Sequence, residues 1–203
     1  MFEVEVKLRA SHDAVRPALA EADAVLVERV TQVDTYYDAP HRDFAETDEA
    51  LRLRRETRES DVERELDRHP DGDDPAQADQ EAATTKLTYK GPLVDADSKA
   101  REEHETGVDD GDTAAAIFDG LGFEPAAVVE KHRTFYELDG YTVTLDRVAG
   151  LGEFVEVEAE TEASDDVASV REGAFEVLRT LGLDPTDQIR TSYLGMLLDA
   201  DTE

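Results

Sequence analysis

The sequence has 203 residues, a formal net charge of −30 from 51 acidic and 21 basic side chains, and no cysteine. The missing cysteines exclude disulfides, thiolate nucleophiles and cysteine-based metal sites, and no apolar run is long enough for a membrane-spanning helix. The acidic surface disfavours nucleic acid and anionic membranes as partners. With arginine preferred to lysine, it resembles proteins of a high-salt cytoplasm, and without a secretion signal we expect a cytoplasmic, halophilic protein.

The first expected strand, residues 2–8, has one apolar and one charged face. Because successive side chains of a strand point to opposite faces, Glu3, Glu5 and Lys7 share a face. One interpretation is a half-exposed strand whose charges are solvated. The other is that two carboxylates about 7 Å apart hold a divalent metal, and that the ammonium meets an anion brought by the metal.

The next elements reverse the sign of the charged face. A helix is expected from Ser11, as N-cap, to Ala22, and a strand from about Val25 to Tyr37. In the alternating segment that follows, Arg52 and Arg54 lie on one face. From about residue 59 to residue 84 the chain is acidic and rich in proline and glycine, which predicts a solvated loop inserted in a single domain covering residues 1–203.

The second half of the chain adds further same-face charges. The strand after the loop places Lys86, Thr88 and Lys90 on one face, and later strands pair Lys131 with Arg133 and Glu156 with Glu158. Asp139-Gly140 is a hairpin signal between two of these strands. Helices are expected over residues 114–121, 164–181 and 192–199.

The count is about eight strands, mostly joined by hairpins, with helices at the ends and between two strand groups. If such a sheet closes, one face of every strand must point inward. The apolar faces then fill a core and leave the charges solvated, or the charged faces line a polar tunnel. The second arrangement explains why basic pairs lie on strands of a chain that is otherwise short of cations, since cations and glutamates together form a site for a polyanion with a metal.

The ordered set of motifs resembles the CYTH family, which includes class IV adenylyl cyclases, thiamine triphosphatases and inorganic triphosphatases. The E-x-E-x-K strand of Glu3, Glu5 and Lys7 resembles the defining motif of the family. The later pieces that match, in order, are Thr35–Asp38, Leu51–Arg54, Leu87–Pro92, Arg101–Glu103, Glu130–Arg133, Leu145–Glu158 and Ser192-Tyr193.

The resemblance implies an α+β fold: a closed eight-stranded antiparallel β-barrel, or tunnel, with a charged interior and flanking helices. It implies Mg²⁺ or Mn²⁺ as cofactor and a small-molecule triphosphate, ATP or tripolyphosphate, as partner, and leaves a homodimer open. The implied metal ligands are Glu3, Glu5, Asp146, Glu156 and Glu158; the implied triphosphate ligands are Lys7, Arg52, Arg54, Lys86, Lys90, Lys131 and Arg133; and the implied catalytic residues are Glu5, Lys7 and Asp146. A turn carboxylate is the alternative interpretation of Asp146.

Several activities are compatible with this pattern. The whole-chain match favours conversion of ATP to cyclic AMP and pyrophosphate. The alternative is hydrolysis of inorganic triphosphate, thiamine triphosphate or a nucleoside triphosphate, and a remoter one is non-catalytic binding of polyphosphate or nucleotide. Bacterial class IV cyclases commonly carry a His-Phe pair shortly before the E-x-E-x-K strand, and Met1 directly precedes this strand, which counts against cyclase activity. A purely acidic interaction protein would show no phosphate-dependent stabilisation.

Overall fold

The computed structural model describes residues 2–58, 83–93, 101–162 and 166–200. The strands are β1 (Phe2–Arg9), β2 (Val25–Asp38), β3 (Ala50–Arg58), β4 (Ala83–Leu93), β5 (Arg101–Val108), β6 (Glu124–Leu138), β7 (Tyr141–Val148) and β8 (Gly152–Thr161). The helices are α1 (His12–Glu21), α2 (Phe44–Thr47), α5 (Gly111–Gly120), α6 (Val167–Thr180) and α7 (Tyr193–Ala200), with a 3-10 turn η2 at Pro185–Asp187. No helix in these ranges has the length and apolar character needed to cross a membrane.

The strands form one eight-stranded sheet in the order β1-β8-β7-β6-β2-β3-β4-β5. The pairs β1–β8, β8–β7, β7–β6, β2–β3, β3–β4 and β4–β5 are antiparallel. An eight-stranded antiparallel sheet with helices is therefore confirmed, whereas its closure into a barrel remains a prediction. The inserted loop predicted over residues 59–84 lies outside the described residues, apart from its last two, which begin β4.

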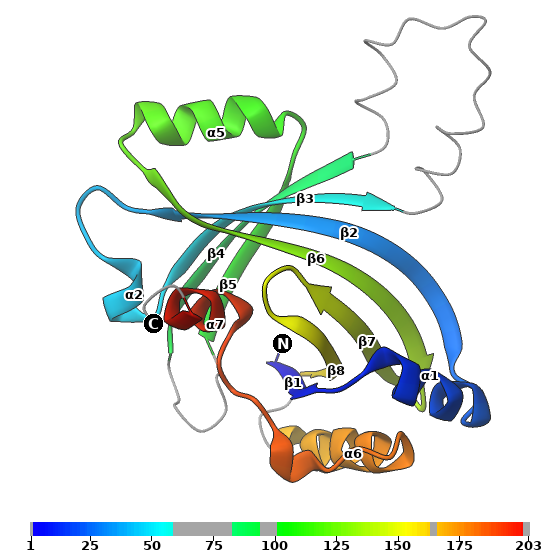
Figure 1. Ribbon diagram of the computed structural model, residues 1–203. Helices are drawn as coiled ribbons and strands as arrows, with labels where there is room; N and C mark the ends of the chain where they lie inside the picture. Colours follow the sequence, from blue (N-terminus) through cyan, green and yellow to red (C-terminus); the bar gives the residue numbers. More distant parts are fainter. Residues whose placement is uncertain (1, 59–82, 94–100, 163–165, 201–203) are drawn as a thin grey trace, which may run out of the picture. The chain divides into compact units, whose positions relative to one another are not determined.

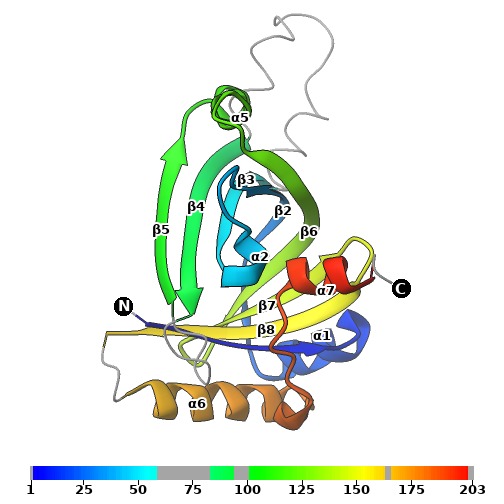
Figure 2. The same ribbon diagram turned by 90° about the vertical axis from the view of Figure 1, so that its left-hand side faces the viewer.

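The chain divides into two compact units, one of residues 1–29 with 131–203 and one of residues 30–130. In the first unit, α6 lies along β1 and β8, as Figures 1 and 2 show. The apolar faces of the strands form a core with α1 and α6, and its members include Val6, Leu145, Val157, Leu178 and Leu19. This packing uses one face of each strand, so the charged side chains of the same strands lie on the opposite face.

Local signals explain several element boundaries. Asp139 and Gly140 both have positive φ, 53° and 80°, as a two-residue type I′ hairpin requires, so the predicted turn is confirmed. Helix α5 begins three residues before its expected start because Asp110 caps it and accepts the Thr113 N–H at 2.9 Å. The short α2 is not anticipated by the sequence.

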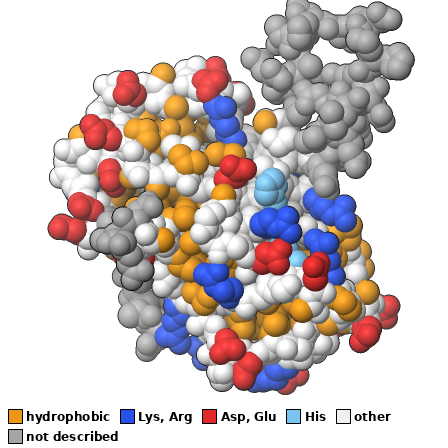
Figure 3. Space-filling view, in the orientation of Figure 1, with side chains coloured by type: hydrophobic (Ala, Val, Ile, Leu, Met, Phe, Trp, Pro, Cys, Tyr) orange, Lys and Arg blue, Asp and Glu red, His pale blue; other side chains and the backbone are white. Residues whose placement is uncertain are grey.

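The second unit consists of β3, β4, β5, α2, α5 and the adjoining parts of β2 and β6. Phe118 of α5 packs edge-on against Tyr37 of β2, with ring centroids 5.0 Å apart. Ile117 and Leu121 at this helix remain exposed. Figure 3 shows acidic side chains scattered over the visible surface, in keeping with the net charge of −30.

Candidate active site

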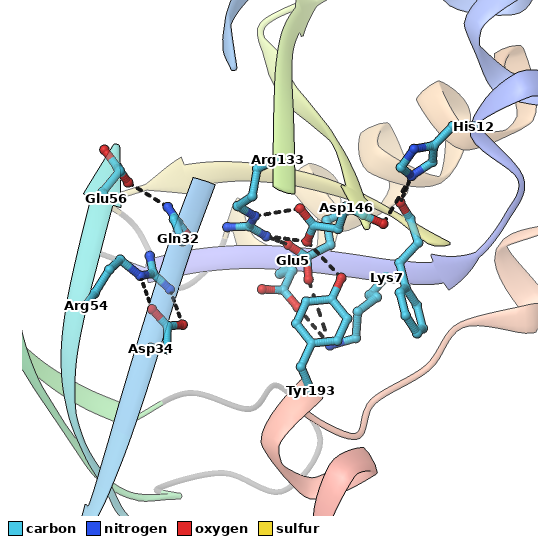
Figure 4. A network of polar contacts seen from close by, with 12 residues as sticks. Glu5, Lys7, His12, Gln32, Asp34, Arg54, Glu56, Arg133, Asp146 and Tyr193 are labelled. Carbon is cyan, nitrogen blue, oxygen red and sulfur yellow. Dashed lines mark hydrogen bonds and ion pairs between the residues drawn. The ribbon is translucent and has the colours of Figure 1, made fainter. Parts of the chain in front are cut away.

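The charged face of the first unit is assembled by cross-strand pairing. Lys7 lies directly opposite Glu156, Glu5 lies opposite Glu158, and Arg133 lies opposite Asp146. The neighbouring strands therefore place the predicted residues of β1, β6, β7 and β8 on one patch, part of which is drawn in Figure 4. Most of this patch is buried: Lys7, Lys131 and Glu156 are 4 %, 4 % and 3 % exposed. Solvated charges, the first interpretation of these strands, do not describe it.

Three carboxylates of this patch could hold a metal. Glu5, Glu156 and Glu158 each offer an oxygen, and these oxygens lie within 4.8 Å of one another. An all-oxygen donor set suits Mg²⁺ or Mn²⁺. The Oγ1 of Thr144, opposite Glu156 on β7, is buried and has no hydrogen-bond partner among the described residues.

The sequence predicts two further metal ligands, Asp146 and Glu3. Asp146 is engaged elsewhere, as a partner of Arg133. Glu3 lies on β1 opposite Glu160, but its side chain is outside the described part of the structure. Both therefore remain predictions as metal ligands.

Arg133 joins the carboxylates into a network. Its Nε donates to Asp146 Oδ1 and its Nη2 to Asp146 Oδ2, both at 2.6 Å, and Nη2 also contacts Glu156 Oε2. This is a bidentate guanidinium–carboxylate pair, which fixes orientation as well as charge. Asp146 is fully buried. Its interpretation as a turn carboxylate is wrong, since it lies within β7.

The environment moves the pKa values of these acids in opposite directions. Burial raises the pKa of Glu156 to about 8, and the negative charge of Glu5 adds to that effect while Arg133 opposes it. Burial alone would also raise the pKa of Asp146, but the charge and hydrogen bonds of Arg133 hold it below its ordinary value. Glu156 can therefore carry a proton near neutral pH while Asp146 stays ionised.

Tyr193, the first residue of α7, covers the same patch. Its hydroxyl donates to Asp146 Oδ2 at 2.8 Å, and its ring centroid lies 4.4 Å from Lys7 Nζ and 5.8 Å from Lys131 Nζ. Burial and the charges of Glu156 and Asp146 raise the pKa of the phenol, so it remains a hydrogen-bond donor. Figure 4 shows the ring between α7 and these side chains.

His12 supports the patch from the backbone side. Its Nε2 lies 3.1 Å from the carbonyl oxygen of Asp146 and 3.2 Å from that of Phe154, which are cross-strand partners. Because both partners are acceptors, Nε2 carries the hydrogen. The backbone N–H of His12 also donates to Glu153 at 3.0 Å. These hydrogen bonds of His12 therefore link the start of α1 to β7 at Asp146 and to β8 at Glu153 and Phe154.

The second unit holds its own group of predicted phosphate ligands, centred on Asp34. Arg54 donates from Nε to Asp34 Oδ1 at 2.7 Å and from Nη2 to Oδ2 at 2.9 Å, and Arg52 Nη1 lies 3.6 Å from Oδ2. Asp34 is fully buried and Arg52 is 7 % exposed. The Nε of Arg52 is buried without a hydrogen-bond partner in the described residues, an unused donor suited to an anion.

The lysines of β4 are paired with carboxylates of β5. Lys86 donates to Glu105 and Lys90 lies against Glu103, both at 2.9 Å. Thr88, which shares their face, donates to Glu105 at 3.0 Å and accepts from Arg52 at 3.1 Å. The second unit thus brings Arg52, Arg54, Lys86 and Lys90 onto one face of β3 and β4, each beside a carboxylate that an incoming anion would have to displace.

Four residues of these groups have no role predicted from the sequence: Tyr193, His12, Asp34 and Glu105. The segments that resemble CYTH motifs include Ser192-Tyr193 and Thr35–Asp38, which directly follows Asp34. Asp34 also shares a face with Tyr36 on an expected strand. Neither pattern indicates which residues these side chains contact. Glu105 shares a face with Glu103 at a spacing of two residues, whereas no spacing pattern includes His12. Their partners lie far along the chain, so only the pairing of the strands reveals them.

The CYTH domain family model matches residues 1–193. The chain belongs to the CYTH domain family. It is 32 % identical over 197 residues to a protein of Methanocaldococcus jannaschii provisionally named an adenylate cyclase, covering 97 % of this chain and 98 % of that one. It is 25 % identical over 194 residues to the adenylate cyclase CyaB of Aeromonas hydrophila, covering 95 % and 86 %.

Solved structures share the fold of this CYTH chain. A protein of Pyrococcus horikoshii, 34 % identical, superposes with a TM-score of 0.79 over 98 % of this chain and 99 % of that one. A Hippeastrum protein described as a provisional adenylyl cyclase with a dominant triphosphatase activity is 18 % identical, with a TM-score of 0.63 over 98 % and 96 %. The second likeness concerns the fold alone.

Proposed function

We propose that this CYTH protein is a metal-dependent enzyme that acts on a triphosphate. The observation that carries the proposal is the group of Glu5, Glu156 and Glu158 within 4.8 Å of one another, beside the buried Lys7 and the partly buried Arg133. Carboxylates that could hold a hard cation, next to cations that could hold phosphate oxygens, are the parts that phosphoryl and nucleotidyl transfer require.

The charges of the first-unit patch suit a metal and a polyanion bound together. Four carboxylates, Glu5, Asp146, Glu156 and Glu158, face three cations, Lys7, Lys131 and Arg133. A bound Mg²⁺ or Mn²⁺ would make the net charge of this patch positive and would neutralise phosphate oxygens. Lys7 and Lys131 would hold phosphate oxygens as point charges, while Asp146 fixes the guanidinium plane of Arg133 toward the same ligand.

We propose the same role in phosphate binding for Arg52, Arg54, Lys86 and Lys90 of the second unit. The unused Nε of Arg52 supports it. In this proposal residues 1–203 form one CYTH domain, and the binding of tripolyphosphate or ATP replaces carboxylate partners such as Glu105. A cytoplasmic location is part of the same proposal.

The reaction that we favour is that of class IV adenylyl cyclases, in which the ribose 3′-hydroxyl of ATP attacks the α-phosphorus and pyrophosphate leaves. The names of the Methanocaldococcus and Aeromonas relatives support it. The second candidate is hydrolysis of a triphosphate by water at its terminal phosphorus. The triphosphatase activity described for the Hippeastrum protein supports that candidate.

The products separate these reactions. The protein is incubated in molar KCl with ATP or tripolyphosphate and either Mg²⁺ or Mn²⁺. Cyclic AMP with pyrophosphate identifies a cyclase, and orthophosphate identifies a triphosphatase. Stabilisation by tripolyphosphate without turnover identifies a binding protein. If neither product forms with either metal, the proposal of an enzyme is overturned, whether or not tripolyphosphate stabilises the protein.

The metal site has its own test. Glu5→Gln removes one charge from the group of three while keeping the shape of the side chain, so we expect turnover to be abolished and the melting temperature to be retained. Glu160→Gln, an exposed position on β8, is the matched control and should keep full activity. Undiminished turnover in Glu5→Gln would contradict the assignment.

A further inference from the structure

We propose that Tyr193 is a positioning residue for the proposed triphosphate site, whose ring holds the ammonium group of Lys7 in place without forming a direct hydrogen bond to it. This inference rests on the proposed function, and it assigns part of the phosphate-binding geometry to helix α7. The evidence lies wholly within the first unit.

The ring faces both lysines at cation–π distance. Lys7 Nζ is 4.4 Å and Lys131 Nζ is 5.8 Å from the ring centroid, and both lysines are buried. An aromatic face attracts a cation through its quadrupole, most strongly where water is excluded. Glu5 and Glu156 form ion pairs with Lys7, but their oxygens lie 3.8 and 3.9 Å from Nζ. These distances exceed that of a direct charge-assisted hydrogen bond.

The lysines of the second unit are held in a different way. Lys86 and Lys90 each have a carboxylate oxygen at 2.9 Å. A phosphate that binds there must displace a directly hydrogen-bonded carboxylate. A phosphate that binds Lys7 meets an ammonium whose nearest paired carboxylate oxygens in the described residues are 3.8 and 3.9 Å away. The ring therefore fixes the position of the cation and leaves its charge for the ligand.

Tyr193 is itself held rigidly. Its hydroxyl donates to the buried Asp146 at 2.8 Å, and its ring packs edge-on against Phe154 with centroids 5.0 Å apart. The segment that leads to it is tied to the site strand, because the N–H of Ile189 donates to the carbonyl oxygen of Lys7 at 2.7 Å. The Oγ of Ser192 caps α7 by accepting the N–H of Gly195 at 3.0 Å. The same short segment thus fixes both the backbone of Lys7 and the ring over its side chain.

The test varies the electrostatic character of the ring at constant shape. Tyr193→Phe keeps the face and loses the hydroxyl, and progressively fluorinated phenylalanines placed at position 193 then weaken the quadrupole. The dissociation constant for tripolyphosphate with Mg²⁺ is measured by calorimetry on the full chain in molar KCl. Fluorinated residues at Phe118, which packs on Tyr37 in the other unit, are the matched control.

We expect Tyr193→Phe to bind within about threefold of wild type and the fully fluorinated ring to bind about tenfold more weakly, with intermediate rings in between. Tyr193→Leu should match the weakest of the series. KM should follow the dissociation constant, while kcat changes less. The series at Phe118 should leave binding unchanged.

Two results would overturn the inference. If the wild-type protein and every ring variant at position 193 bind tripolyphosphate equally well, Tyr193 has only a packing role. The proposed function then stands without this positioning role. If wild-type protein does not bind tripolyphosphate at all, the proposed function and this inference fall together.

Discussion

The raised pKa of Glu156 makes the stability of the metal-free protein depend on pH. A carboxyl whose pKa rises from 4.5 to about 8 on folding holds its proton in the native state when the unfolded chain has lost it. The native state then binds more protons between these two values, so the free energy of unfolding falls as the pH rises from about 4.5 to about 8. Below 4.5 the contribution of this group is complete, and above 8 it is lost.

The size of the effect follows from the same shift. At about 1.4 kcal/mol per pKa unit, the contribution of Glu156 to the fall is at most about 5 kcal/mol. Glu156→Gln cannot titrate, so the pH dependence of this variant should be flatter by that amount. Glu160→Gln, on the same strand but exposed, should keep the dependence of the wild type.

The pH dependence of the free energy of unfolding is measured by urea unfolding with a chelator present. A constant molar KCl concentration screens the surface charges. Saturating Mg²⁺ should remove much of the decrease in the free energy of unfolding as the pH rises. A cation at Glu5, Glu156 and Glu158 favours the ionised form of Glu156. Identical pH dependences for wild type and Glu156→Gln would refute the reasoning. So would an Mg²⁺ effect that is the same at pH 5 and pH 8.

Two further predictions concern stability. Asp34→Asn should lower the free energy of unfolding by about 3–5 kcal/mol in urea melts, because it breaks the buried pair with Arg54 and leaves a guanidinium without its carboxylate; an unchanged midpoint would show that the pair contributes nothing net. Gly173→Ala should destabilise by about 1–3 kcal/mol although alanine favours helices, because its Cβ would lie 1.9 Å from the Tyr141 hydroxyl oxygen. Gly120→Ala in α5 should not destabilise, because an added Cβ would meet no other part of the described structure within 4 Å beyond its own helix backbone and chain neighbours.

Much of the fold could be predicted because it depends on local, periodic signals. Alternation predicted β1, β7 and β8, and the pair Asp139-Gly140 predicted their neighbouring hairpin through the positive φ that a type I′ turn needs. The start of α5 was placed too late because its cap, Asp110, precedes the apolar residues by which the helix was recognised. The closure of the sheet depends on contacts between its ends, which no local pattern specifies.

The candidate site could be predicted only in part, for a related reason. Spacing of two residues places Glu5 with Lys7, or Glu156 with Glu158, on one face, but it does not say which strand lies alongside. The register supplies that information: it sets Lys7 against Glu156 and Arg133 against Asp146. The spacing predicted the cations as phosphate ligands but did not indicate the carboxylates that lie beside them in the structure.

The internal pairing of the cations bears on how a triphosphate could bind so acidic a protein. A cluster of unpaired arginines and lysines would be costly to bury, since desolvated charges need partners. Asp34, Glu103, Glu105 and Asp146 meet that need in the free protein. An incoming polyanion then exchanges one set of negative partners for another, so its affinity reflects a difference between two ion-paired states. The exchange should cost least at Lys7, because its ion pairs with Glu5 and Glu156 are longer, at 3.8 and 3.9 Å, and the face of Tyr193 at 4.4 Å remains in place.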